Sequence, residues 1–441
     1  MSRDRGMDLV LRRVRVRDDQ PLVDIGMADG RIAAIAECLP DKAAEQIDGG
    51  GHVVIPGLVE THLHLDKALL AERRPNRSGT LAEAIRITGE QKQEFTPEDV
   101  RTRAEAALRM VLRHGTTAIR AETEFDPVVG LLGVKELLRL KERYAPLVDI
   151  QVVAFPQEGV HQTPGTEELF WEAMELGADV VGGIPYNDLD AEKHIDLCFE
   201  IARTYDKPIS LHQDFRDDAD ALSIEYVAHK TIAEGWQGRV ELGHATALGA
   251  VEPRRLSRIL DLLRAADISV VPLPATDLHL GGRGDAYNVR RGLAPVRALL
   301  EAGVNVAVSS NNIRNAYTPF GNGDLLVIAN LLIAAAHLGG AETLPRVLDM
   351  VTINAARAIG IGSRYGLQVG RPADLVVLQT QRVRDAVIDI PERLWVVKDG
   401  RVTVVNRLVT EFRRGPRGSS GTEAPDPPAR ARLATPEARP R

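Results

Sequence analysis

Short segments of alternating apolar and polar residues mark both ends of the chain. Residues 9–16 alternate apolar and charged side chains, and Asp29-Gly30 lies between two further strand candidates. The pattern recurs at residues 374–378 and 394–405, the latter around a second Asp-Gly pair. A period of two predicts β-strands, and Asp-Gly between such runs predicts a hairpin. Strands this short bury little surface alone, so we expect both ends to form one small β-sandwich.

Between these ends, apolar strand-like runs alternate with helical segments. The runs lie at residues 53–58, 116–122, 150–155, 180–184, 209–212, 240–244, 268–273 and 304–309. Helical spacing of apolar residues is found, for example, at residues 97–113, 195–205, 224–234, 253–265 and 325–338. Eight strand–helix units predict an α/β fold with a (β/α)₈ barrel of the TIM type.

These patterns divide the chain into three parts. We expect residues 7–57 and 366–412 to form the β-sandwich and residues 58–365 to form the barrel. Residues 413–441 are rich in proline and glycine and have no periodic apolar positions. We expect this tail to be disordered.

Composition limits the possible partners. The 441 residues are 44% hydrophobic and 27% charged, an ordinary globular balance, and the net charge of −7 argues against nucleic acid. The chain has neither an apolar run of membrane-spanning length nor a recognisable signal peptide, so we expect a cytoplasmic protein without a membrane partner. Cys38 and Cys198 are far apart and outside any CxxC motif, which argues against a disulfide framework. We expect a homo-oligomer that binds a small molecule.

The histidines suggest where chemistry takes place. His62 and His64 follow the first apolar run, and on a strand this spacing directs both imidazoles to one side. An isolated pair of this kind is often two packing or surface histidines. However, His212 and His244 also lie at predicted strand ends, where barrel enzymes carry their chemistry. Four such histidines predict a metal site, whereas His279, in the loop expected after the seventh strand, remains undecided.

These histidines and the flanking sandwich resemble the amidohydrolase superfamily. Residues 151–159 (QVVAFPQEG), 279–283 (HLGGR) and 290–292 (RRG) resemble bacterial cytosine deaminases. Residues 312–314 (NIR) and 319–324 (PFGNGD) resemble aminohydrolases that act on N-isopropylammelide.

The resemblance implies roles for several residues. It implies that His62, His64 and His212 bind one divalent metal ion, zinc or iron, and that the eighth strand supplies a fourth ligand. It implies that His244 contacts the metal-bound water or the substrate. The substrate-binding residues that it implies are Gln157 at the amide edge of a ring, Tyr317 as an aromatic wall, and Asn312 within the matching motif.

The chain departs from the family at two positions of the expected site, Asn311 and Phe215. The eighth strand carries Asn311 where the family has an aspartate that binds the metal and accepts a proton. An asparagine oxygen can bind a hard metal but brings neither the charge nor the proton acceptor. Phe215 stands where cytosine deaminases have a glutamate. We therefore take Asp214 as the candidate proton shuttle, because it is two residues beyond His212; its alternative role is to orient a loop or pair with Arg216.

A further departure lies on the second strand, where the family pattern Thr-His-Val-Asp is replaced by Ala121-Glu122-Thr123-Glu124. Glu122 and Glu124 share one face of the strand. One or both could restore the negative charge missing at Asn311. The alternative is a solvated pair of acids at the mouth of the strand.

The leading functional hypothesis is a metal-dependent amidohydrolase. Such an enzyme would deaminate a small nitrogen heterocycle, such as a pyrimidine or triazine, by cleaving a C–N bond with activated water. The alternatives are a degenerate barrel that acts as a binding or regulatory protein, and a cyclic amide hydrolase. Asn311 and Phe215 favour the binding protein, whereas the four histidines favour the enzyme.

Overall fold

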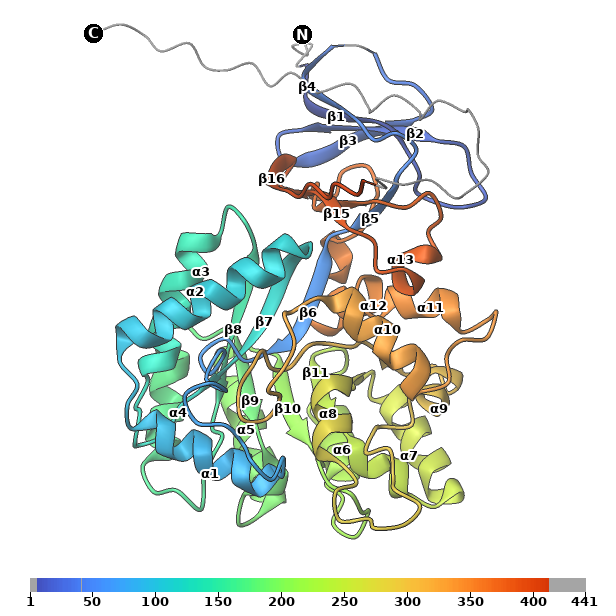
Figure 1. The fold of residues 1–441 in the computed structure, drawn as a ribbon. Helices are drawn as coiled ribbons and strands as arrows, with labels where there is room; N and C mark the ends of the chain where they lie inside the picture. Colours follow the sequence, from blue (N-terminus) through green and yellow to red (C-terminus); the bar gives the residue numbers. More distant parts are fainter. Residues whose placement is uncertain (1–5, 41, 412–441) are drawn as a thin grey trace, which may run out of the picture. The chain divides into compact units, whose positions relative to one another are not determined.

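Both chain ends contribute strands to two small sheets in the computed structural model of this chain (Figure 1). The strands are β1 Met7–Val14, β2 Val23–Ala28, β3 Arg31–Ala36, β4 Ala43–Asp48, β5 Val53–Pro56, β14 Leu375–Leu378, β15 Arg393–Lys398 and β16 Arg401–Val405. The sheet orders are β3-β2-β1-β4 and β16-β15-β14-β5. All strand pairs are antiparallel except β1 with β4. The prediction that the two chain ends pair is confirmed by the ladder between β5 and β14.

The two small sheets share one apolar core. Leu9 and Ile25 from the first sheet are fully or almost fully buried in the same cluster as Leu375 and Val397 from the second. Because each sheet is too small to bury its apolar face alone, each depends on the other for its stability.

The structure describes residues 6–40 and 42–411, so the tail expected at 413–441 lies outside the described residues. The described residues up to Asn406 form one unit. Within the described residues, no helix is long and apolar enough to cross a membrane.

The middle of the chain forms an eight-stranded parallel sheet. Its strands are β6 Leu58–Leu63, β7 Thr116–Glu124, β8 Asp149–Phe155, β9 Val180–Gly183, β10 Ile209–Gln213, β11 Val240–His244, β12 Ser269–Val271 and β13 Asn305–Val306. They are hydrogen-bonded in sequence order. Beyond β13, the Asn311 N–H donates to His62 O at 3.0 Å and Asn311 O accepts from the His64 N–H at 2.8 Å. These bonds join the first strand to the segment after the last, which is consistent with a TIM-type barrel.

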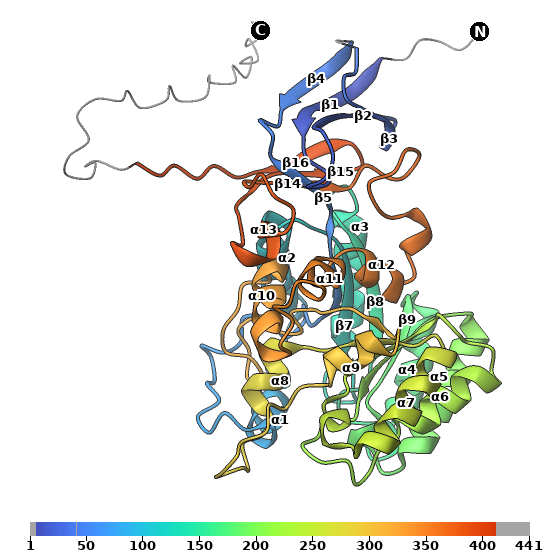
Figure 2. The ribbon, with the colours of Figure 1, turned by 90° about the vertical axis from the view of Figure 1, so that its right-hand side faces the viewer.

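Helices connect the parallel strands; Figure 2 shows α5, α6 and α7 outside them. The α-helices are α1 Leu81–Lys92, α2 Pro97–Arg113, α3 Leu132–Tyr144, α4 Thr166–Glu175, α5 Ala191–Tyr205, α6 Ile224–Ala233, α7 Pro253–Ala265, α8 Pro274–Leu280, α9 Val296–Glu301, α10 Leu325–Ala335, α11 Leu344–Asp349, α12 Ile353–Ala358 and α13 Asp385–Ile388. The 3₁₀ turns are η1 Pro185–Asn187, η2 Thr246–Ala250 and η3 Gly362–Arg364. Both α2 and α7 have the predicted bounds, because each begins with proline after a capping side chain, Thr96 or Glu252.

The first apolar run is divided, contrary to the prediction of a single strand. Gly57 separates β5, in a small sheet, from β6, in the parallel sheet (Figure 1). A Cβ at position 57 would lie 2.1 Å from Thr117 Oγ1, so the close approach of Thr117 requires glycine there. His62 therefore lies within the first parallel strand rather than after it.

Candidate metal centre

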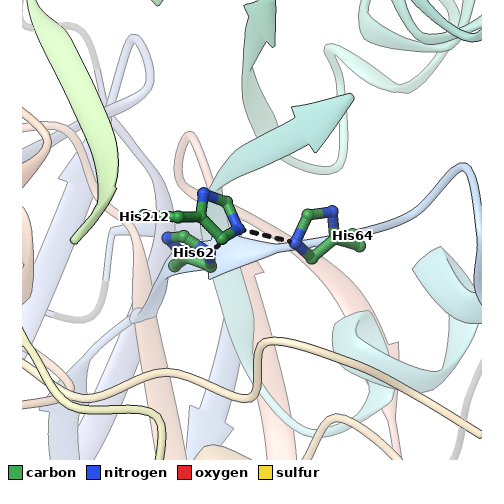
Figure 3. Close-up of side chains that lie close together, drawn as sticks. All are labelled: His62, His64 and His212. Carbon is green, nitrogen blue, oxygen red and sulfur yellow. Dashed lines mark hydrogen bonds between the residues drawn. The ribbon is translucent and has the colours of Figure 1, made fainter. Parts of the chain in front are cut away.

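Three imidazoles meet at one end of the parallel sheet (Figure 3). His62 is in β6, His64 directly follows that strand, and His212 is in β10. The Nε2 atom of His212 lies 3.1 Å from Nε2 of His62 and 3.1 Å from Nε2 of His64. All three side chains are buried. The structure thus brings together the three residues that the sequence suggested as metal ligands.

The chemistry of this cluster fits a divalent cation. Burial, and then neighbouring charges, hold the pKa of all three histidines well below its usual value, so the imidazoles are neutral. His212 Nε2 has one bonding position and two Nε2 neighbours, so hydrogen bonding cannot satisfy all three atoms. Buried Oδ1 of Asn311 has no hydrogen-bond partner among the described residues. Neutral imidazole nitrogens and a free carbonyl oxygen suit zinc or iron.

His244 ends β11 beside this cluster, with its ring centroid 5.5 Å from that of His212. Its Nδ1 lies 2.6 Å from Oδ1 of Asp277 in α8, whose Oδ2 accepts the Leu273 N–H at 2.8 Å. A neutral imidazole that donates from Nδ1 leaves Nε2 free to accept a proton. His244 has a φ of 67°, a strained conformation that its surroundings must enforce.

Asp277 was missed in the sequence because its role depends on α8 folding back over the strand end. The undecided His279 lies in the same helix. Its ring is perpendicular to that of Phe320, with the centroids 5.5 Å apart, and its main-chain oxygen accepts from Arg283. In the described part of the chain, His279 is not a member of the histidine cluster.

Asp214 does not lie where the strand alternation placed it. Its carboxylate accepts from Ser223 Oγ and the Ile224 N–H, each at 3.0 Å, and from the Ser223 N–H at 3.2 Å. The strand β10 ends at Gln213, and a φ of 40° at Asp214 turns the chain away from the alternating pattern. Within residues 6–40 and 42–411, Asp214 is absent from the lining of the pocket beside the histidines. These hydrogen bonds match the alternative, structural role of Asp214, because its carboxylate holds the start of α6; its role as proton shuttle stays a prediction.

Asn311 is fixed in the site by its main chain and lines the pocket. Its φ of 60° is left-handed, as for His244. The preceding Ser309 and Ser310 both donate to the buried carboxylate of Glu60 on β6. Burial raises the pKa of Glu60 to about 7, and these hydrogen bonds oppose the shift. Glu60 thus anchors the segment that was predicted as the end of the eighth strand.

The pocket beside the histidines is lined by all three predicted substrate-binding residues, Gln157, Tyr317 and Asn312. Its cavity has a volume of about 20 Å³, room for roughly one water molecule. Lys67, which sequence reasoning missed, also lines it. Lys67 Nζ donates to Gln157 Oε1 at 2.8 Å and lies 4.7 Å from the Tyr317 ring centroid. Gln157 therefore offers its amide N–H₂ group to a ligand.

Glu122 and Glu124 are buried, so the alternative of a solvated pair is wrong. Glu124 forms ion pairs with Lys67 and Lys92. Burial alone would raise the pKa of Glu124, but the two lysines lower it to about 2. Burial, and then the Glu241 carboxyl, raise the pKa of Glu122 to about 8. The interior of the parallel sheet is thus polar beneath the histidines.

Comparisons with known proteins agree with this geometry. Residues 45–404 match the protein family described as the amidohydrolase family. The chain is 32% identical over 416 residues to N-isopropylammelide isopropyl amidohydrolase of Pseudomonas sp. (strain ADP), a match that covers 93% of this chain and 100% of that protein. The structure of 5-methylcytosine deaminase from Klebsiella pneumoniae, liganded with phosphonocytosine, matches with a TM-score of 0.87 and 34% identity, covering 91% of this chain and 100% of that one. The structure of N-isopropylammelide isopropylaminohydrolase from Burkholderia multivorans ATCC 17616 matches with a TM-score of 0.80 and 31% identity. This match covers 90% of this chain and 98% of that one.

Proposed function

Because this chain belongs to the amidohydrolase family, we propose that it is a metal-dependent hydrolase that removes an amine from a small nitrogen heterocycle, such as a pyrimidine or triazine. The observation that carries this proposal is the convergence of three neutral Nε2 atoms, two of them from His64 and His212, which line a pocket together with Gln157, Lys67 and His244. The names of two similar proteins refer to 5-methylcytosine and to N-isopropylammelide, both small nitrogen heterocycles.

His62, His64 and His212 would hold one zinc or iron ion, which when bound supplies Lewis acidity and activates water at neutral pH. His244, held by Asp277 through Nδ1, moves a proton at Nε2 towards the leaving amine. The amide N–H₂ group of Gln157 and the ammonium of Lys67 donate to acceptor atoms of the ring. The small cavity excludes bulk water, and a ring enters only after lining side chains move.

Asn311 and Phe215 support the second candidate, a protein that binds a heterocycle without hydrolysing it. The Phe215 ring stacks on His244 with the centroids 4.3 Å apart, and Asn311 cannot accept a proton. A cyclic amide hydrolase would differ from the first proposal in the leaving group.

Metal analysis and turnover assays test the proposal together. Protein purified without chelator should contain about one equivalent of zinc or iron, and it should release ammonia or an amine from at least one compound in a panel of pyrimidines, triazines and pterins. His212→Ala should lose both properties, whereas His279→Ala, which changes a histidine away from the cluster, should retain them. Metal-loaded parent protein that binds panel compounds without turnover would support the binding protein. A parent that binds no metal after supplementation would refute the metal site.

A further inference from the structure

The His62 ring lies between the histidine cluster and two buried carboxyl groups. Its Nε2 faces His212, whereas its Nδ1 lies 3.5 Å from Glu122 Oε1 and 3.9 Å from Glu241 Oε1. All three side chains are completely buried. Among the described residues, Nδ1 of His62 has no hydrogen-bond partner.

We propose that Glu122 is a positioning residue for the metal centre, in that it holds His62 through Nδ1 and supplies the negative charge that Asn311 lacks. This inference rests on the proposed function, because it assumes that the three histidines bind a divalent cation. A neutral imidazole that binds a metal through Nε2 must carry its proton on Nδ1. Glu122 provides the nearer carboxyl oxygen for that proton.

The charges around the two acids distinguish Glu122 from Glu241. Glu241 Oε2 accepts from Arg120 Nη1 at 2.7 Å, so an arginine offsets its charge. Glu122 Oε1 instead accepts from the neutral hydroxyl of Ser210 at 2.8 Å. Across the described residues, the ion pairs of Glu122 involve His62 alone, and its Oε2 has no hydrogen-bond partner. Glu122 is therefore the acid without a lysine or arginine partner among the described residues; burial favours its neutral form, and a dication bound by His62 would favour the carboxylate.

The ligand set explains why the centre needs such a group. The three neutral imidazoles bring no charge against a buried dication, the Asn311 carboxamide in the adjoining pocket would add none, and an uncompensated buried charge is costly. Carboxylates that accept from ligating histidines fix the tautomer and raise the basicity of the ligand, and their loss weakens metal binding by about 10–100-fold. Glu122 lies where such a carboxylate would lie, beside Nδ1 of His62, whereas Nε2 of the same ring would bind the metal.

Zinc affinity of the full chain tests this role without an activity assay. The parent, Glu122→Gln, Asn311→Asp and the double variant would be titrated with zinc against a chromophoric chelator at fixed pH. We expect Glu122→Gln to weaken zinc binding by about 10–100-fold. Asn311→Asp should tighten it, and the loss caused by Glu122→Gln should become much smaller in the Asn311→Asp background. Glu136→Gln, which alters a buried glutamate paired with arginines, should bind zinc as the parent does.

A second variant, Glu122→Asp, keeps the carboxylate and serves if Glu122→Gln does not fold. If Glu122→Gln folds, Glu122→Asp should bind zinc more tightly than it does. If Glu122→Gln is unfolded, the zinc affinity of Glu122→Asp should lie within about tenfold of that of the parent. Parent-like affinity in Glu122→Gln would overturn the inference, as would an equal loss in both Asn311 backgrounds, which would indicate a purely structural role. Absence of zinc binding in the parent would instead refute the proposed function itself.

Discussion

At the scale of single residues, Asp214 illustrates a buried carboxylate with a structural role. It accepts hydrogen bonds from Ser223 and Ile224 at the start of α6, where the helix dipole favours an acceptor. In Asp214→Asn an amide N–H₂ group would face one of these donors, so we expect the free energy of unfolding to fall by about 1–3 kcal/mol. Urea unfolding would measure this loss, and Asp218→Asn in the exposed part of the same loop should show little change. A stable Asp214→Asn protein that binds zinc but has lost turnover would support the predicted role of Asp214 as proton shuttle.

The stability contributed by His194 should depend on pH. Its Nε2 accepts the Ile184 N–H at 3.0 Å and its Nδ1 lies 2.7 Å from Asp188, so the ring is neutral. Burial lowers the pKa of His194 in the folded protein, whereas in the unfolded chain it is about 6.5. At a pH between these two pKa values, His194 is protonated in the unfolded chain and neutral in the folded protein. Stability is thus lost as the pH falls, by at most about 1.4 kcal/mol per pH unit.

His194→Gln removes this titration. The difference in unfolding free energy between the parent and the variant should therefore narrow from pH 7.5 to pH 5.5, as measured by urea unfolding. A constant difference would contradict the neutral assignment.

The chemistry of single residues was partly predictable from sequence. His212 and His244 could be placed because an apolar run indicates where each strand ends, whereas His62 and His64 could be paired from their spacing of two residues. The departure of Asp214 could not, because it depends on one backbone angle that the residue pattern does not encode.

At the scale of elements, β11 leaves space for a histidine of the metal centre, because Gly243 has no side chain where the His62 ring lies. A Cβ at Gly243 would lie 2.9 Å from Cε1 and 3.0 Å from Nδ1 of His62. Gly243→Ala should therefore displace the His62 ring and weaken zinc binding by about tenfold or more, since a shifted ligand loses its geometry. Gly89→Ala is the matched control, because within the described residues a Cβ there meets nothing within 4 Å. Unchanged zinc affinity in Gly243→Ala would show that β11 does not position His62.

Element boundaries were predictable where the sequence contains a local stop or start. The helices α2 and α7 begin at proline after a cap, and both were predicted to the residue. The division between β5 and β6 was not predictable, because the apolar pattern continues through Gly57. That break is set by Thr117 from another strand, a contact that becomes visible after folding.

At the scale of the whole molecule, Arg393 connects β15, in a small sheet, to α2 and α10, two helices of the barrel-like part of the chain. It forms an ion pair with Asp324, the N-cap of α10, and donates to the main-chain oxygen of His114 at the end of α2. Arg393→Leu leaves Asp324 buried without this partner, so we expect a loss of about 3–5 kcal/mol in the free energy of unfolding. Chemical denaturation would measure it, with the exposed Arg401→Leu as control. Equal stability in the two variants would mean that Arg393 contributes no more than a surface charge.

The ladder between β5 and β14 also governs events during synthesis. The partner of Ile55 in that ladder is Val376, more than 300 residues later in the chain. A ribosome adds roughly 5–20 residues per second, so β5 leaves the exit tunnel tens of seconds before its neighbour exists. The strand that leads into the metal centre therefore has an open edge through most of translation, and its final pairing closes a very long loop. In a cell this edge would be a natural binding site for chaperones until the last strands emerge.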